Sequence, residues 1–369
     1  MSTAIPLVDL KAQHAQVAAE VASGLERVMS ETAFIQGKDV AQFEQAFAAF
    51  SGVKHCIGVA NGTDALELAL RANDIGPGDE VLVPANTFIA SALAVVRAGA
   101  MPRLVDCDPD YQLLDPDQLS RHINPRTRAI MPVHLFGQLA PMEAISEVAR
   151  AHNLIMVEDA AQAQGAARNE RGAGAWGSAT GTSFYPGKNL GAYGDAGGVI
   201  TNDDSVATRV RQLGNYGSNV KYHHPALGFN SRLDTLQAVV LNAKLKRLAA
   251  WNEQRRAAAA RYKELLADVP GIVLPETMPG NQHIWHLFVV RVGRRDEVLQ
   301  RLHAAGIGAG VHYPKPIHMQ GAFSHLGHRP GDFPIAERAA SEILSLPMFA
   351  EITPEQQERV VSELRRALG

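Results

Sequence analysis

Apolar and polar positions alternate between two periods along the first two thirds of the chain. Short runs that are almost continuously apolar, such as residues 55–60 and 80–84, indicate strands buried on both faces of a sheet. The segments that follow them, residues 64–72 and 89–98, carry apolar residues at helical spacing. Strands that alternate with helices predict a parallel sheet covered by helices on both faces. The same pattern predicts further strands at residues 103–106, 128–135 and 154–158 and a helix at residues 142–151.

The alternation changes after residue 179. Residues 180–185 and 198–202 predict two neighbouring strands, followed by a helix at residues 205–213 and a polar loop at residues 214–228. A long helical stretch at residues 234–266 is then expected to leave the first domain. These patterns divide the chain into a large domain, residues 1–240, and a smaller domain, residues 241–369.

The smaller domain is expected to be α+β. Its predicted strands are residues 284–292 and 308–312, and its predicted helices are residues 296–305, 335–344 and 354–368. Two amphipathic helices near the start of the chain, residues 17–29 and 40–50, are expected to pack on this smaller domain.

Composition excludes several classes of protein. The chain has 35 Lys and Arg against 38 Asp and Glu, a formal net charge of −3, which argues against a binder of nucleic acid or of anionic membranes. No apolar run approaches the roughly 18 residues needed to span a bilayer, and the first ten residues lack a secretory pattern. Cys56 and Cys107 lie in apolar runs and are expected to be buried thiols of a cytoplasmic protein.

In an open α/β sheet, ligands bind beyond the carboxyl ends of the parallel strands. The first predicted strand is followed by Gly62 and Thr63 at the start of a helix. Glycine permits close approach of a ligand, threonine supplies a hydroxyl, and the free N–H groups of a helix start attract an anion such as phosphate. An ordinary helix cap without a ligand is the alternative interpretation of this segment.

Three further residues follow strand ends in an informative order. Asp159 ends one predicted strand, and Lys188 lies in a glycine-containing turn after another. Pyridoxal phosphate (PLP) needs a phosphate site, a carboxylate on its pyridine nitrogen and a lysine amine for a Schiff base. Phe88, beyond a neighbouring strand, could stack on the flat ring. The sequence therefore predicts a PLP site, although Asp159 or Lys188 taken alone would be an ordinary cap or surface residue.

Two other motifs do not indicate a dinucleotide or a metal site, and the histidine-containing loops are expected to bind substrate or to face solvent. Residues 172–177 fit G-x-G-x-x-G, but they follow a polar turn and precede a strand-like segment, whereas a dinucleotide site needs a strand before and a helix after. Histidines in residues 222–225 and 312–318 lie in turn-rich loops without metal-ligand spacing, so no metal site is expected.

The chain resembles the PLP-dependent nucleotide-sugar aminotransferases of the DegT/DnrJ/EryC1/StrS family, from about Ile5 to Met348. The resemblance rests on short segments that occur in the family's order, namely residues 60–66, 86–88, 158–162, 183–188, 228–234 and 311–314. It implies the aspartate-aminotransferase-like fold (fold type I), with a mostly parallel mixed sheet, and a homodimer with active sites at the subunit interface.

The resemblance also implies roles for individual residues. Lys188 would form the internal aldimine, Asp159 would pair with the pyridine nitrogen, and Gln162, where many relatives have His, would lie near the phenolic oxygen. The other residues implied to contact the cofactor are Gly62, Thr63 and Ser183 on the phosphate, Phe88 on the ring, and Asn230 reaching the phosphate from the neighbouring subunit. The residues implied to face the sugar nucleotide are Tyr185, Tyr216, Tyr222, His223, Arg232, His312, Tyr313 and His318.

The implied reaction is a two-step amino transfer. L-glutamate converts PLP to its amine form, pyridoxamine phosphate (PMP), which then aminates a UDP- or dTDP-linked keto sugar. Residues 215–234 look most like members that aminate a 3-keto sugar, with amination at C4 as the alternative. Related dehydratases have His in place of the lysine, so Lys188 favours an aminotransferase. A PLP-binding regulator would carry a DNA-binding domain or a basic patch, and neither is visible.

Overall fold

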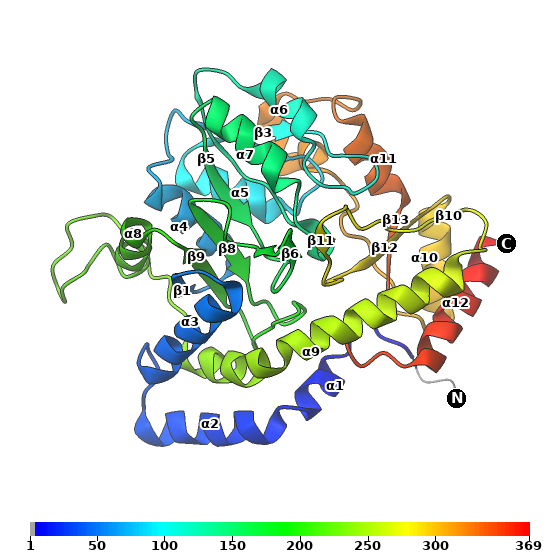
Figure 1. Cartoon of the computed structure of the whole chain (residues 1–369), viewed down its shortest axis with the longest axis horizontal. Helices are drawn as coiled ribbons and strands as arrows, with labels where there is room; N and C mark the ends of the chain where they lie inside the picture. Colours follow the sequence, from blue (N-terminus) through cyan, green and yellow to red (C-terminus); the bar gives the residue numbers. More distant parts are fainter. Residues whose placement is uncertain (1–3) are drawn as a thin grey trace.

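The computed structural model describes residues 4–369, and its centre is a seven-stranded sheet in the order β1-β9-β8-β5-β4-β2-β3 (Figure 1). Only β9 runs antiparallel to its neighbours, so the carboxyl ends of the other six strands lie at one edge, called the carboxyl edge below. The strands are β1 (His55–Val59), β2 (Glu80–Pro84), β3 (Met101–Val105), β4 (Thr127–Ile130), β5 (Ile155–Asp159), β8 (Ala179–Ser183) and β9 (Gly197–Thr201).

Helices cover both faces of this sheet, as the apolar runs predict. One face is covered by α4 (Gly62–Ala72), α5 (Ile89–Ala98) and α8 (Asp204–Gly214), which share one apolar core with the sheet. The other face is covered by α6 (Pro116–His122), α7 (Met142–Ala151) and α3 (Lys38–Ser51). The chain is therefore α/β with a mostly parallel mixed sheet, as the apolar pattern predicts, and this is consistent with the fold type I that the resemblance implies.

Helix α9 (Thr235–Leu266) joins the two parts of the molecule, running from beneath the large sheet to α12 (Pro354–Leu368) (Figure 1). Leu241 and Leu248 lie in a core with the large sheet, whereas Tyr262 and Leu266 lie in the core of the smaller part. A division at residues 240 and 241 stays a prediction, because this one helix contributes to both cores.

The smaller part holds a three-stranded antiparallel sheet, β10 (Ile272–Val273), β12 (Phe288–Val292) and β13 (Ile343–Leu346), with α10 (Arg295–Ala304), α11 (Pro334–Glu342) and α12. The predicted strand at residues 308–312 is wrong, since only Gly310 pairs, with Ser345. The predicted helix at residues 335–344 ends early, because residues 343–346 are fully buried and pair with β12. A second small sheet joins β6 (Ala167–Arg168), β7 (Arg171–Gly172) and β11 (Asn281–Gln282).

The N-terminal helices α2 (Ala18–Glu31) and α3 both pack along α9, the helix shared by the two parts, so their packing on the smaller domain alone stays a prediction. Phe43 and Phe47 of α3 lie edge-on to Phe184, beside the large sheet. Their ring centroids are 5.2 Å (Phe43) and 5.1 Å (Phe47) from that of Phe184. Along the chain, α1 (Leu10–Ala15) lies between α2 and Ile5, and Ile5 reaches the smaller core. An amphipathic face predicts burial but does not identify the core it will join.

No helix within residues 4–369 is both long enough and apolar enough to cross a membrane.

The glycine-rich segment at residues 172–177 surrounds a buried carboxylate. Glu158 is fully buried, and its oxygens accept hydrogen bonds from the N–H groups of Gly174 (3.1 Å) and Gly177 (2.8 Å). Glu158 also bonds to the buried His134 ring (2.8 Å) and accepts from the Thr180 hydroxyl (3.1 Å). Burial opposes ionisation, but the bonds from His134 and the backbone outweigh it and lower the pKa of Glu158. The segment that fits a dinucleotide motif is therefore structural.

Replacing Glu158 with Gln should lower the free energy of unfolding by about 3–5 kcal/mol, because several buried donors then face an amide N–H₂. Urea unfolding measures this, with Glu342→Gln as control, which breaks a partly exposed pair with Arg338 and should cost less than about 1 kcal/mol. Because the folded-state pKa of Glu158 is lowered, its contribution is present above the unfolded pKa and disappears as the pH falls through the folded value. Equal losses in the two variants would contradict this role.

Candidate functional site

Close packing at the carboxyl edge brings the start of α4 against β8 and β9. A Cβ on Gly62 would lie 2.6 Å from the Cβ of Ser183, and a Cβ on Gly197 would lie 2.4 Å from the carbonyl carbon of Asn61. No larger residue fits at either position without a shift of the chain. These glycines therefore hold the first turn of α4 directly beside Ser183.

This first turn has the properties of an anion site. Asn61 caps the helix, its side chain accepting from the N–H of Asp64 (2.9 Å) and its carbonyl from that of Ala65 (3.0 Å). The N–H groups of Gly62 and Thr63 remain available, because the first turn of a helix offers them no carbonyl. Together with the hydroxyls of Thr63 and Ser183, they can hold a phosphate.

Asp159 ends β5 and is buried. One carboxylate oxygen accepts from the Ser91 hydroxyl (2.7 Å) and the other from the N–H of Ala161 (3.1 Å). Ser91 also hydrogen-bonds with Thr87 at 2.9 Å, so the carboxylate is held from α5 and the segment before it. The sequence analysis did not select Ser91, although a polar residue on the apolar face of residues 89–98 is a signal that could have identified it.

Lys188 lies in the turn after β8, where its backbone N–H donates to the carbonyl of Tyr185 at 2.8 Å. The side chain is partly accessible, and no residue in the range 4–369 accepts a hydrogen bond from its Nζ. Burial of the surrounding turn lowers the pKa of Lys188 to about 8, against the opposing charge of Asp159. A substantial fraction of this amine is therefore neutral, and so nucleophilic, in mildly alkaline solution.

Aromatic and amide side chains cover the same edge. Phe88 is half exposed, and its ring lies 5.0 Å from that of Tyr313, tilted by 35°. Gln162 donates to the Tyr313 hydroxyl (3.1 Å) and accepts from the N–H of Phe136 (2.6 Å), so both ends of its amide are engaged. Burial, followed by the charge of Asp159, raises the pKa of Tyr313, which keeps this hydroxyl protonated.

Two histidines near Lys188 are held neutral. Burial and the charge of Lys188 lower the pKa of His312 to about 4, and its Nδ1 hydrogen-bonds with the Ser345 hydroxyl at 2.8 Å. Burial, then Lys188 and Arg255, hold the pKa of His286 well below its usual range. The sequence analysis missed His286, and its signal is a lone histidine within the apolar residues 284–292.

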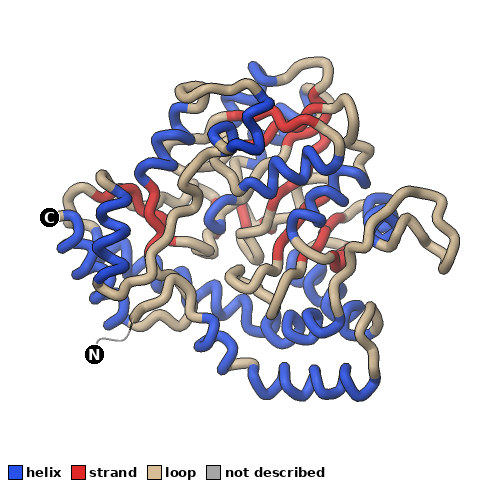
Figure 2. Tube along the Cα trace, turned by 180° about the vertical axis from the view of Figure 1, so that it is seen from behind, coloured by secondary structure: helices blue, strands red, loops and turns tan. Residues whose placement is uncertain are grey.

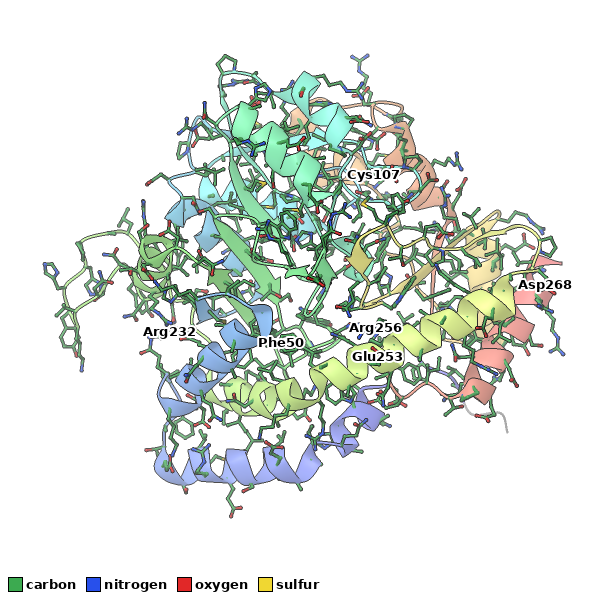
Figure 3. The ribbon with its side chains drawn as sticks, viewed as in Figure 1. Phe50, Cys107, Arg232, Glu253, Arg256 and Asp268 are labelled. Carbon is green, nitrogen blue, oxygen red and sulfur yellow. The ribbon has the colours of Figure 1, made fainter. Side chains whose placement is uncertain are left out.

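Five of the proposed substrate and cofactor residues lie on or beside a projecting loop, residues 215–230, called the arm below. Figures 1 and 2 show the arm leaving the body next to α8, and Figure 3 marks Arg232 near its base. Arg232 lies 5.7 Å from the Tyr216 ring and bonds to Asn215 (3.4 Å). The five residues are Tyr216, Tyr222, His223, Asn230 and Arg232. Within residues 4–369, none of them forms a hydrogen bond with Lys188, Asp159 or Tyr313.

Two other candidates differ in their placement. Tyr185 is 58% exposed, beside the turn that carries Lys188. The side chain of His318 is fully buried, with its Nε2 bonded to Glu337 at 2.9 Å and its ring against Phe333. A contact between His318 and the substrate stays a prediction, since this ring is enclosed and its neighbour Phe333 belongs to the apolar core of the large sheet. No cluster of three or more potential metal ligands occurs in residues 4–369.

Comparison with known proteins identifies one family. The model of the DegT/DnrJ/EryC1/StrS aminotransferase family matches residues 15–365. A "dTDP-3-amino-3,4,6-trideoxy-alpha-D-glucose transaminase" from Streptomyces venezuelae is 46% identical over 98% of this chain and 95% of its own. A "UDP-N-acetyl-3-dehydro-alpha-D-glucosamine 3-aminotranferase" from Acidithiobacillus ferrooxidans is 45% identical over 100% and 99%. A "Pleiotropic regulatory protein" from Geobacillus stearothermophilus is 46% identical over 98% and 97%.

A solved structure of similar sequence has the same fold. It is described as the S. venezuelae DesV protein in complex with a ketimine intermediate, and it is 46% identical to this chain. The two superpose with a TM-score of 0.97 over 99% of this chain and 98% of the other.

Aminotransferases of the matched family depend on PLP. The residues at the carboxyl edge fit that group in three respects. The Lys188 amine has no hydrogen-bond acceptor among residues 4–369, the Asp159 carboxylate is already oriented by Ser91, and the first turn of α4 offers free N–H groups beside Ser183. A side chain at position 62 would disturb this phosphate site, because its Cβ would lie against Ser183.

The charge of Asp159 should control the basicity of Lys188. In the protein without cofactor, the rate of reductive methylation of Lys188 should rise with pH around a midpoint near 8. Asp159→Asn removes the charge that raises this pKa, so the midpoint should move to lower pH. Peptide mapping by mass spectrometry across a pH series gives the midpoint, with Asp268→Asn at the far end of α9 as control (Figure 3). A midpoint that stays fixed or rises in Asp159→Asn would show that the two groups do not interact.

Proposed function

The chain belongs to the DegT/DnrJ/EryC1/StrS aminotransferase family, and from this premise we propose that it transfers an amino group from L-glutamate to C3 of a dTDP- or UDP-linked 3-keto sugar. The observation that carries the proposal is the Lys188 amine, partly accessible, lowered in pKa and without a hydrogen-bond acceptor within residues 4–369, close to the oriented carboxylate of Asp159.

When bound, PLP supplies an aldehyde for amines and an aromatic ring that withdraws electrons from the attached carbon. The residues of this chain have separate tasks around it. Lys188 would hold the group through Nζ, and its amine, when not attached, would accept and return a proton at Nζ. Asp159 would keep a negative charge at the pyridine nitrogen and so hold that nitrogen protonated. Ser91 and the N–H of Ala161 fix the direction of the Asp159 carboxylate.

The remaining residues proposed to contact the cofactor would hold it in place and set its orientation. Gly62, Thr63 and Ser183 would bind the phosphate, and Phe88 would stack on the ring. Gln162 would contact the phenolic oxygen, and its amide is kept in place by the N–H of Phe136. This contact by an amide replaces the histidine of many relatives and supplies a neutral donor.

The arm supports the proposal of a homodimer with shared sites. It carries apolar and aromatic side chains in contact with solvent, including Tyr222 (84% exposed) and Leu227 (96% exposed). Asn230 is exposed at the return of the arm. A second copy of the chain would bury these side chains and receive Asn230 at the phosphate of its own cofactor. Arg232 then recognises the diphosphate of the sugar nucleotide, for which a guanidinium is a suitable donor.

The names of the two transaminase relatives favour amination at C3 over C4. A role as a regulator receives no support from charge, since the chain has a formal net charge of −3.

The substrate is tested with the PMP form of the purified protein. Excess L-glutamate generates this form, which is then offered dTDP- and UDP-linked 3-keto and 4-keto sugars while the PLP absorbance is followed. The expected result is recovery of that absorbance with a 3-keto sugar nucleotide, and none with Lys188→Ala. Faster reaction with the 4-keto isomer would overturn the assignment to C3, and loss of water without amino transfer would identify a dehydratase.

Subunit mixing tests the shared site. Lys188→Ala and Asn230→Ala proteins should each lose most activity, because one lacks the amine and the other a phosphate ligand. After verified subunit exchange, mixed dimers should regain part of the activity, since one of their two sites has neither substitution. An absence of rescue would show that each site is formed within one subunit.

A further inference from the structure

Beneath the turn that carries Lys188, the protein interior contains a set of uncharged amide side chains. Asn189, Asn252 and Gln164 are 1%, 3% and 3% exposed. Buried amides destabilise a fold unless their donors and acceptors are paired, so their hydrogen bonds constrain the segments that carry them.

Asn252 of α9 is bonded in two directions. Its Oδ1 accepts from Nδ2 of Asn189, the residue next to Lys188, at 2.9 Å. Its own Nδ2 donates to the backbone carbonyl of Gln164, also at 2.9 Å. The side chain of Gln164 in turn donates to the carbonyl of Ser183 at 2.7 Å. One residue of α9 thus connects the lysine turn to the strand end that carries the phosphate hydroxyl.

The orientation of the Asn189 amide is fixed by its other partners. Its Nδ2 also donates to the carbonyl of Ile284 at 3.2 Å, so this atom must be the nitrogen. The Oδ1 therefore accepts from Nδ1–H of His286, at 3.1 Å. An amide held at three points cannot rotate without leaving a buried group unpaired.

Other features support α9 as the frame of this turn. Gln237 accepts from the N–H of Tyr193 at 2.8 Å, and the ammonium of Lys244 donates to the carbonyl of Gly191 at 2.7 Å. A Cβ on Gly165 would lie 2.8 Å from Nδ2 of Asn252, and the φ of Gly165 is +92°. Only glycine at this position lets the Asn252 amide reach the Gln164 carbonyl.

We propose that Asn252 is a positioning residue that sets the separation between the Lys188 amine and the phosphate site at Ser183. The proposal rests on the function proposed above. The cofactor is a rigid ring with its aldehyde and its phosphate on different carbons, so its two attachments require a fixed distance between their protein partners. Asn252 holds both partners to one helix, and neither the lysine turn nor the end of β8 can shift alone.

The test compares Asn252→Leu with Gln357→Leu. Gln357 is a matched control, because it is 2% exposed and its amide donates to the Ala258 carbonyl of α9 at 2.7 Å, away from the lysine turn. Three quantities are measured for each holoprotein: the dissociation constant of PLP, the visible circular dichroism per bound PLP at saturation, and the thermal midpoint.

In Asn252→Leu, PLP should bind at least about 10-fold more weakly, because buried groups next to both attachments lose their partners, and the visible circular dichroism should fall. Gln357→Leu should lower the thermal midpoint and leave both PLP measurements unchanged. If Asn252→Leu does not fold, Asn252→Asp replaces it, since it keeps the acceptor for Asn189 but faces the Gln164 carbonyl with an oxygen.

Affinity and circular dichroism within twofold of the wild type in a folded Asn252 variant would overturn the proposal. Equal changes in Gln357→Leu would also overturn it, because the effect would then be one of general stability. A wild-type protein that forms no PLP absorption band would instead overturn the proposed function, so the two failures are distinguishable.

Discussion

The site depends on an amine and a carboxylate placed close together at the ends of two adjacent parallel strands, without a hydrogen bond between them. Asp159 is engaged by Ser91 and Ala161, which leaves the Lys188 amine free of acceptors within residues 4–369. Desolvation then lowers the pKa of Lys188 to about 8 while Asp159 opposes it. If Asp159 bound the ammonium directly, the amine would stay protonated and could not attack an aldehyde.

The sheet and α9 maintain this arrangement from two sides. Because β9 alone is reversed, β1, β5 and β8 all deliver their carboxyl ends to one edge, and glycines at positions 62 and 197 let that edge close. Helix α9 approaches the same edge from below and bonds to the lysine turn through Gln237, Lys244 and Asn252. The helix also joins the core of the smaller part, so the site is attached to both cores.

The sequence predicted the elements best where the apolar runs were long and bounded. Strand β2 and helices α5, α7 and α12 have the expected bounds, and Gly62, Asp159 and Lys188 lie at the same edge of the sheet, as expected from the sequence. It could not identify Ser91 or Asn252, since a polar residue in a helix shows no partner in the sequence. Asn252 bonds to Asn189, 63 residues away. Its position in a turn-rich loop also gave no sign that the side chain of His318 is buried.

A second lysine makes the central claim sharply testable. Lys244 is buried and also has a pKa lowered to about 8, chiefly by burial, but its Nζ already donates to Gln13 (2.8 Å) and to the carbonyl of Gly191 (2.7 Å). The two lysines therefore have similar basicity. They differ in that the Lys188 side chain is partly accessible and its amine has no hydrogen-bond acceptor within residues 4–369. The most direct measurement is borohydride reduction of the PLP-bound protein followed by peptide mapping. The account predicts a stable pyridoxyl label on Lys188 alone, and a label on Lys244 or any other lysine would contradict it.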